Sequence, residues 1–152
     1  VTSIGAGSFR ECISLESISI PSNVSDIGKE AFSTCKSLAT IEINNDYCVT
    51  NFHEIFENSY RTKSVILGNG VTYINNASFS KYNIKSIIIP SSVKEIRDDA
   101  FLDCSDLTSV SIANGVKSFG NRCFSGCHSL KSFIILIQLY QLELLHFPMI
   151  KA

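Results

Sequence analysis

The chain has 152 residues, of which 45% are hydrophobic and 18% are charged. Such a composition can bury a core, which excludes an intrinsically disordered chain, and the length suits one ordered unit. The formal net charge is -1 and lysine and arginine are scattered singly, so we expect no nucleic-acid partner.

A repeat of about 23 residues organises almost the whole sequence, and a clear copy begins at Ile18. Its fixed positions are I-x-I-P-x-x-V-x-x-I-G-x-x-A-F-x-x-C-x-x-L-x-x. The first two apolar residues alternate with other residues, which predicts a short strand with one buried face. The first residue of this pair is Ile18, Ile41, Val65, Ile87, Val110 or Phe133, and the second is Ile20, Ile43, Leu67, Ile89, Ile112 or Ile135.

The rest of each repeat follows the strand in a fixed order. A turn such as Pro21-Ser22-Asn23 comes first, since proline presets φ and asparagine tolerates positive φ. Val24 and Ile27 then predict a second extended segment. Phe32, Cys35 and Leu38 are spaced by three residues, which predicts one or two turns of helix. Because the chain begins at Val1, inside a repeat, we expect it to belong to a longer protein, and no signal peptide can be identified.

The third repeat, from Tyr47 to Leu67, departs from the pattern, with Phe56 one position early and Tyr60 where cysteine is expected. The fourth repeat also has a tyrosine, Tyr82, at the cysteine position. Two interpretations are open here, namely local repacking of the core and an aromatic binding pocket.

One repeat cannot bury its own apolar face, so successive repeats must stack and share a core. Adjacent strands in such a stack lie about 4.8 Å apart, so six repeats form a solenoid on the order of 30 Å long. After residue 135 the pattern fails, and residues 136–152 form an apolar tail. Three roles are open for this tail: a cap on the solenoid end, an interface with a further segment, and a membrane contact.

The repeat resembles the BspA-like, or treponemal-type, class of leucine-rich repeats, most closely from Ile20 to Ile43. The resemblance covers residues 1–135. It implies an α/β fold, a right-handed leucine-rich-repeat solenoid with a parallel sheet and about six repeats of 22 to 24 residues. It also implies a protein-binding, non-enzymatic role, because members of this class occur on the surfaces of oral and gut bacteria and of parasitic protists, where adhesion is the usual proposal.

The cysteines do not predict a metal site. Cys12, Cys35, Cys104 and Cys127 occupy the repeat position three after phenylalanine, where buried thiols pack as small hydrophobes, and disulfides between neighbouring repeats are the alternative. Cys123, Cys127 and His128 lack a second ligand pair for zinc. No catalytic, cofactor-binding or metal-binding residues are predicted.

The outward positions of the strands are the natural binding surface of a solenoid. The position before the first core residue forms a hydroxyl column, and the position between the two core residues places isoleucines side by side in the third and fourth strands. Adjacent exposed apolar residues mark an interaction site, and cross-strand packing is the competing account. The candidate residues are Ser17, Ser19, Thr40, Glu42, Ser64, Ile66, Ser86, Ile88, Ser109 and Ser111, and the sixth strand adds Ser132 and Ile134.

The outward columns and the resemblance together predict a module that binds other proteins through its sheet face, and the resemblance implies that it belongs to a surface or secreted adhesion-type protein. An intracellular scaffold is the first alternative, and a carbohydrate-binding or enzymatic role is the second. Two glycosylation acceptor triplets, at Asn23 and Asn76, lie in predicted turns and suit an extracellular location.

Overall fold

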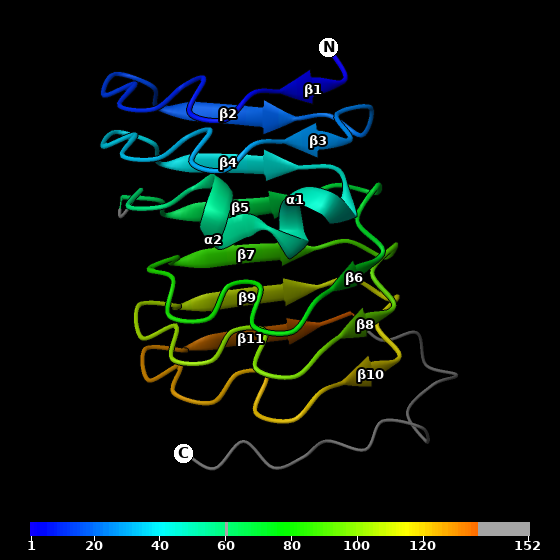
Figure 1. Cartoon of the computed structure of the whole chain (residues 1–152). Coiled ribbons are helices and arrows are strands. Elements are labelled where there is room, and N and C mark those ends of the chain that lie inside the picture. The colour runs from blue at the N-terminus through cyan, green and yellow to red at the C-terminus, as the bar shows by residue number, and fades with distance from the viewer. Residues whose placement is uncertain (60, 137–152) are drawn as a thin grey trace.

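The computed structural model describes residues 1–59 and 61–136, which form a parallel solenoid of about six coils (Figure 1). One strand from each coil enters a six-stranded sheet in which every neighbouring pair is parallel. Chain order is also the spatial order of these strands, as the repeat predicts. They are β2 (Ser17–Ile20), β4 (Thr40–Ile43), β5 (Ser64–Leu67), β7 (Ser86–Ile89), β9 (Ser109–Ile112) and β11 (Ser132–Ile135).

The register of this sheet places equivalent repeat positions directly opposite each other. Ile18 pairs with Ile41, and Ile41 pairs with Val65. Ile41 and Val65 are fully buried, whereas the residues beside them in sequence face outward or are half-buried. The predicted alternation between core and outward positions is therefore confirmed for these strands.

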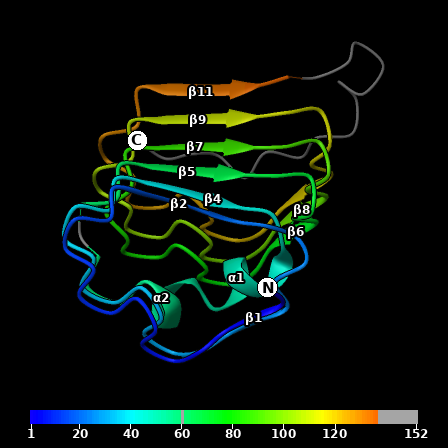
Figure 2. The ribbon, with the colours of Figure 1, turned by 90° about the horizontal axis from the view of Figure 1, so that it is seen from above.

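A second set of short strands follows the turns, on another side of the coils (Figure 2). These strands confirm the predicted second extended segment in every repeat except the third. They form one pair and one triplet, both parallel: β1 (Ser3–Ile4) with β3 (Asp26–Ile27), and β6 (Tyr73–Ile74), β8 (Glu95–Ile96) and β10 (Ser118–Phe119).

The third repeat separates these two groups because it carries two short helices, α1 (Asp46–Thr50) and α2 (Phe52–Ile55). Asn45 caps α1, since its side-chain oxygen accepts a hydrogen bond of 2.8 Å from the Cys48 amide. Asp46 supplies a carboxylate to the first turn of α1, where the helix dipole favours negative charge. In Figure 2 both helices lie across the coil from the six-stranded sheet.

The segments that follow the short strands are turns in the regular repeats, and the predicted helical turns are wrong there. Among the described residues, helix occurs only in the third repeat. The regular segments contain residues in the left-handed region, which an α-helix does not tolerate. Glu30 and Thr34 have φ of 58° and 59°, and Asp99 and Asp103 have φ of 57° and 56°. Alternate backbone amides of these segments bond to the next coil, as Phe101 does to the Cys123 carbonyl at 2.8 Å, and amides between them donate to carbonyls three residues back, as Leu102 does to Asp99 at 2.9 Å.

A stack of phenylalanine rings forms the centre of the core. Phe101 and Phe124 lie parallel, with ring centroids 4.9 Å apart and an interplanar angle of 1°. Phe9 and Phe32 stack in the same way at 5.1 Å. The ring spacing is close to the distance between hydrogen-bonded parallel strands, and the register of those strands places side chains on the outer face in straight columns.

The predicted boundary at residue 135 remains a prediction. Leu136 is described and exposed, but the rest of the tail, residues 137–152, lies outside the described residues. The cap, interface and membrane interpretations of that tail therefore stay open.

Candidate protein-binding surface

The predicted hydroxyl column forms a straight row along the start of the six-stranded sheet. Ser17 pairs with Thr40, and the row continues through Ser64, Ser86, Ser109 and Ser132 by direct pairing of each residue with the next. Ser17 is exposed and the others are half-buried. The structure thus brings together all the residues of this predicted column.

The second predicted column, between the core residues, is also aligned. Glu42 pairs with Ile66, and Ile66 pairs with Ile88. Ile88 keeps 51% of its surface exposed even though it lies beside another isoleucine, while Ile66 is half-buried. The neighbours of these residues in the column are Ser19, Ser111 and Ile134. Ile66 and Ile88 therefore lie side by side on neighbouring strands, and Ile88 is also exposed to solvent, so the two interpretations of this position do not exclude each other.

The repeat cysteines form a column inside the solenoid, in which thiols act as hydrogen-bond donors. The thiols of Cys35, Cys104 and Cys127 donate to main-chain carbonyl oxygens of phenylalanines in the preceding coil, at 3.2, 2.9 and 3.2 Å. All six cysteines of the chain are free. The interpretation of these residues as buried thiols is confirmed for Cys35 and Cys104, while Cys12 and Cys127 near the ends are half-buried.

In the third and fourth repeats, side-chain hydroxyls replace the thiols as hydrogen-bond donors in this inner column. The Ser59 hydroxyl donates to the Phe32 carbonyl at 2.8 Å, so Ser59 rather than Tyr60 takes the cysteine role. Tyr60 lies outside the described residues. The Tyr82 hydroxyl donates to the carbonyls of Phe56 and Ser59 at 3.0 and 3.1 Å, and Tyr82 is only 8% exposed. Tyr82 is therefore a core residue, as the repacking interpretation predicts.

The environment of four thiols, those of Cys35, Cys48, Cys104 and Cys123, favours the protonated form. Burial raises the pKa of Cys123 to about 11, and it also raises the pKa values of Cys35 and Cys48. Hydrogen bonding between Cys104 and Cys127 raises the pKa of Cys104 and lowers that of Cys127. Because the thiolate is the reactive form, the thiols with raised pKa values suit packing and hydrogen bonding rather than nucleophilic chemistry.

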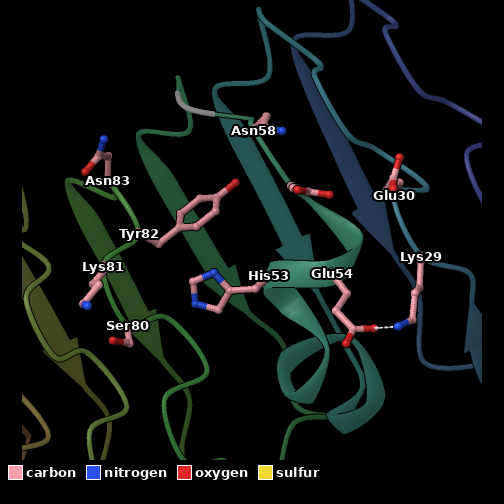
Figure 3. Close-up of a pocket in the computed structure, with 10 residues that line it drawn as sticks. Lys29, Glu30, His53, Glu54, Asn58, Ser80, Lys81, Tyr82 and Asn83 are labelled. Carbon is pink, nitrogen blue, oxygen red and sulfur yellow. Dashed lines mark ion pairs between the residues drawn. The ribbon is translucent and has the colours of Figure 1, made fainter.

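A groove of about 620 Å³, lined by charged and polar residue types, lies beside α2, where the third repeat departs from the regular fold (Figure 3). The Phe56 amide donates within the helix to Phe52, whereas the equivalent Phe79 and Phe101 amides donate to the next coil. The third coil therefore lacks one of the main-chain bonds that close regular coils together. Sequence analysis missed this groove, and the capping sequence Asn45-Asp46 was the available signal for a helix nearby.

The groove contains His53, whose ring centroid lies 5.7 Å from that of Tyr82 at an interplanar angle of 71° (Figure 3). His53 is an exposed residue, but partial desolvation of its ring in the groove lowers its pKa, and hydrogen bonding to the backbone at Ala77 and Ser80 partly offsets this effect. The Glu54 carboxylate lies 3.4 Å from the Lys29 ammonium. Within residues 1–59 and 61–136, no cluster of three or more histidine, cysteine or acidic side chains is placed to hold a metal ion.

Both predicted glycosylation acceptors are exposed. Asn23 lies in a turn between β2 and β3, and its side-chain amide donates to the Val1 carbonyl at 3.0 Å. Asn76 lies in the turn after β6. Among the residues described, no helix combines the length and the apolar composition that crossing a membrane requires.

The geometry and the repeat together define a class, a parallel leucine-rich-repeat solenoid. The chain belongs to the family described as the BspA type leucine rich repeat region, whose six-copy pattern matches residues 1–107 and 52–148. The resemblance seen in the sequence is thereby confirmed. None of the curated proteins compared with the chain matches it.

Solved structures of similar proteins come from several bacteria. A leucine-rich cell surface protein from Faecalibacterium prausnitzii is 25% identical with a TM-score of 0.49, and the match covers 95% of this chain and 32% of that one. A leucine-rich repeat protein from Bacteroides ovatus is 26% identical with a TM-score of 0.51, covering 90% and 47%. The T. pallidum leucine-rich repeat protein is 28% identical with a TM-score of 0.57, covering 86% and 72%. The chain thus spans about a third to a half of the first two proteins.

Proposed function

We propose that this chain is a protein-binding module that recognises its partner through the exposed face of the six-stranded sheet. The observation that carries the proposal is the alignment of the outward residues into two columns, one of hydroxyls and one containing Ile66 and Ile88. A rigid sheet presents such columns at fixed spacing, so a partner can bind them without ordering a loop. Membership of a family of typically non-enzymatic repeat proteins supports binding rather than catalysis.

The composition of this face favours a protein partner over a carbohydrate. Protein-binding surfaces combine an apolar centre with a polar surround, which the isoleucine and hydroxyl columns provide. Sugar rings are commonly held against exposed aromatic faces, and no outward position of the described strands in this sheet is aromatic.

A replacement of two isoleucines tests the site. The purified chain, labelled with biotin, is incubated with extracellular-matrix proteins immobilised on beads and with intact epithelial cells in suspension, and bound protein is measured by flow cytometry. The double variant Ile66→Ser with Ile88→Ser is expected to lose binding while its unfolding curve stays close to that of the parent. Ile13→Ser is the matched control because Ile13 is 58% exposed but lies in a turn outside the sheet. If the double variant binds as well as the parent, the binding site does not lie on the sheet face.

We further propose that the chain functions within a surface or secreted adhesion-type protein. The family resemblance and the two exposed acceptor asparagines support this location. Mass spectrometry of native material tests it, because glycans at Asn23 and Asn76 are expected on a glycoprotein that has passed through a secretory pathway. Unmodified asparagines together with labelling only after permeabilisation of cells would count against a surface location.

An intracellular scaffold is the second candidate, and the six free thiols favour it. Free cysteines are usual where glutathione and thioredoxin keep thiols reduced. Thiol counting on native material separates the two candidates, since oxidised cysteines would favour the secreted form. The binding face would be the same in either location.

A further inference from the structure

Three repeats share a four-residue sequence that the family pattern does not require. It consists of a lysine, a serine, a core residue and an isoleucine, and it begins at Lys63, Lys85 and Lys131. The fifth repeat keeps only the hydroxyls, in Thr108-Ser109-Val110-Ser111. The first two repeats differ in charge, because Glu16 precedes the first strand and Glu42 lies on the second. The sheet therefore has an acidic first third and a basic remainder.

The main chain places the three lysines in one column at the edge where the strands begin. The Lys85 amide donates to the Lys63 carbonyl at 2.9 Å, and the Thr108 amide donates to the Lys85 carbonyl at 2.8 Å. The Lys131 amide continues the series with a bond of 3.0 Å to Thr108. The three lysines are exposed, and in the part of the chain that the structure describes none of their ammonium groups forms an ion pair.

The isoleucine column runs beside the lysines, with the hydroxyl column between them. Ile88 and Ile134 each keep 51% of their surface exposed, and Ser111 lies between them in the register. Strand spacing of about 4.8 Å makes the surface from β5 to β11 about 14 Å long, which matches four to five residues of extended chain. A cationic row, a donor row and an apolar row thus lie in parallel over the same strands.

We propose that the face formed by β5, β7, β9 and β11 binds an acidic protein segment in which carboxylates alternate with apolar side chains. The carboxylates contact the lysine ammonium groups and the serine hydroxyls, both of which donate hydrogen bonds to such groups. The apolar side chains cover the isoleucines, which removes exposed apolar surface from water. The inference rests on the proposed sheet-face function and adds the chemistry of the partner.

The isoleucine row argues for a peptide rather than for a polyanion of sugars or phosphates. A polyanion would use the lysines and hydroxyls but would leave the apolar row in contact with charged groups, which is unfavourable. A peptide with alternating side chains satisfies the polar and apolar rows at the same time. On one surface, the carboxylates of the peptide thus match the lysines, and its apolar side chains match the isoleucines.

Fluorescence anisotropy with the full chain tests this inference. The probe is a labelled peptide of alternating glutamate and leucine, and the comparison probes are a lysine–leucine peptide, a glutamate–serine peptide and a heparin oligosaccharide. The glutamate–leucine peptide is expected to bind most tightly, and its affinity is expected to fall as salt rises because exposed charges are screened. Equal binding of the two leucine peptides, or binding of heparin alone, would overturn the inference.

Two lysine pairs provide a matched comparison. Lys63→Gln with Lys85→Gln is expected to weaken glutamate–leucine binding about fivefold at low salt. The control, Lys94→Gln with Lys117→Gln, removes two exposed lysines that are also neighbours in adjacent coils, since the Lys117 amide donates to the Lys94 carbonyl at 2.8 Å. This control pair lies at the short strands β8 and β10, away from the six-stranded sheet. An equal loss in both pairs would show a general charge effect and contradict the site.

The two proposals fail in different ways. If cells are bound and Ile66→Ser with Ile88→Ser abolishes that binding, while the glutamate–leucine peptide does not bind, then the sheet face functions but the acidic chemistry of the partner is wrong. If the double isoleucine variant binds cells as the parent does, the sheet-face function itself is wrong.

Discussion

The ring of Phe52 lies edge-on to that of Phe79, with centroids 4.7 Å apart and an interplanar angle of 60°. Phe52 also contacts Phe56 and Tyr82 at 4.8 Å. In regular coils one phenylalanine stacks directly on the next, but here Phe52 of α2 is inserted beside the stack between Phe56 and Phe79. The aromatic core thus accommodates the additional ring of the third repeat, and the parallel sheet continues through β4, β5 and β7 without interruption.

Replacement of Phe52 by alanine is therefore expected to destabilise the whole solenoid. Phe52 is fully buried, and truncation of a buried phenylalanine leaves a cavity and costs about 3–5 kcal/mol. Urea unfolding followed by circular dichroism measures the change. Phe9→Ala is the matched control, since Phe9 is 41% exposed at the end of the same aromatic stack, and its loss should be clearly smaller. Equal losses would mean that Phe52 is not central to the core.

The inner donor column gives a second prediction. Ser59→Ala removes the donor to the Phe32 carbonyl and leaves a buried acceptor without its partner, which costs about 1–3 kcal/mol. Ser59→Cys restores a donor of the type that Cys35 and Cys104 use at the equivalent position. Chemical unfolding of the two variants should therefore place the cysteine variant nearer to the parent than the alanine variant. The reverse order would contradict the assignment of Ser59 to this column.

His53 makes stability depend on pH in a definite direction. Its pKa is lowered by folding from an unfolded value of 6.5, so the unfolded chain binds more protons than the folded chain in the interval between the two values. The favourable state, with a neutral imidazole, is fully present above pH 6.5 and is lost as the pH falls through the folded pKa. Urea midpoints between about pH 7.5 and 5.0 should therefore fall less steeply for His53→Gln than for the parent. Identical pH profiles would exclude this contribution.

The free thiols should differ in their rates of alkylation. Cys48 and Cys104 have no exposed surface, and their pKa values are raised, Cys48 by burial and Cys104 mainly by its hydrogen bond with Cys127. With iodoacetamide at about pH 8, native protein should therefore keep these two cysteines unmodified while half-buried Cys12 reacts. Peptide mass spectrometry gives the order of labelling, and urea-unfolded protein should label at all six cysteines. Labelling of Cys48 as fast as Cys12 would contradict the described burial.

The solenoid and its columns could be predicted from the sequence because the same apolar pattern recurs at nearly constant spacing. A core shared by stacked repeats requires equivalent residues to lie side by side, so Ser64 and Ser86 had to be neighbours on the outer face. Ile66 and Ile88 follow for the same reason. The candidate surface was therefore available from the repeat alone, although its binding role is a proposal.

Only the tertiary structure decided the local conformations inside each repeat. The spacing of Phe32 and Cys35 suits helical turns, yet Glu30 and Thr34 adopt left-handed conformations because the Phe32 amide bonds to the neighbouring coil at Ile55. In the third repeat the hydrogen bond forms within the segment, because the Phe56 amide donates to the Phe52 carbonyl of α2. A main-chain amide has alternatives of similar energy inside its own segment and across the stack, and the choice depends on the packing of the adjacent coil. Sequence periodicity determines which residues are buried, whereas the contacts between coils determine where the hydrogen bonds of each segment are made.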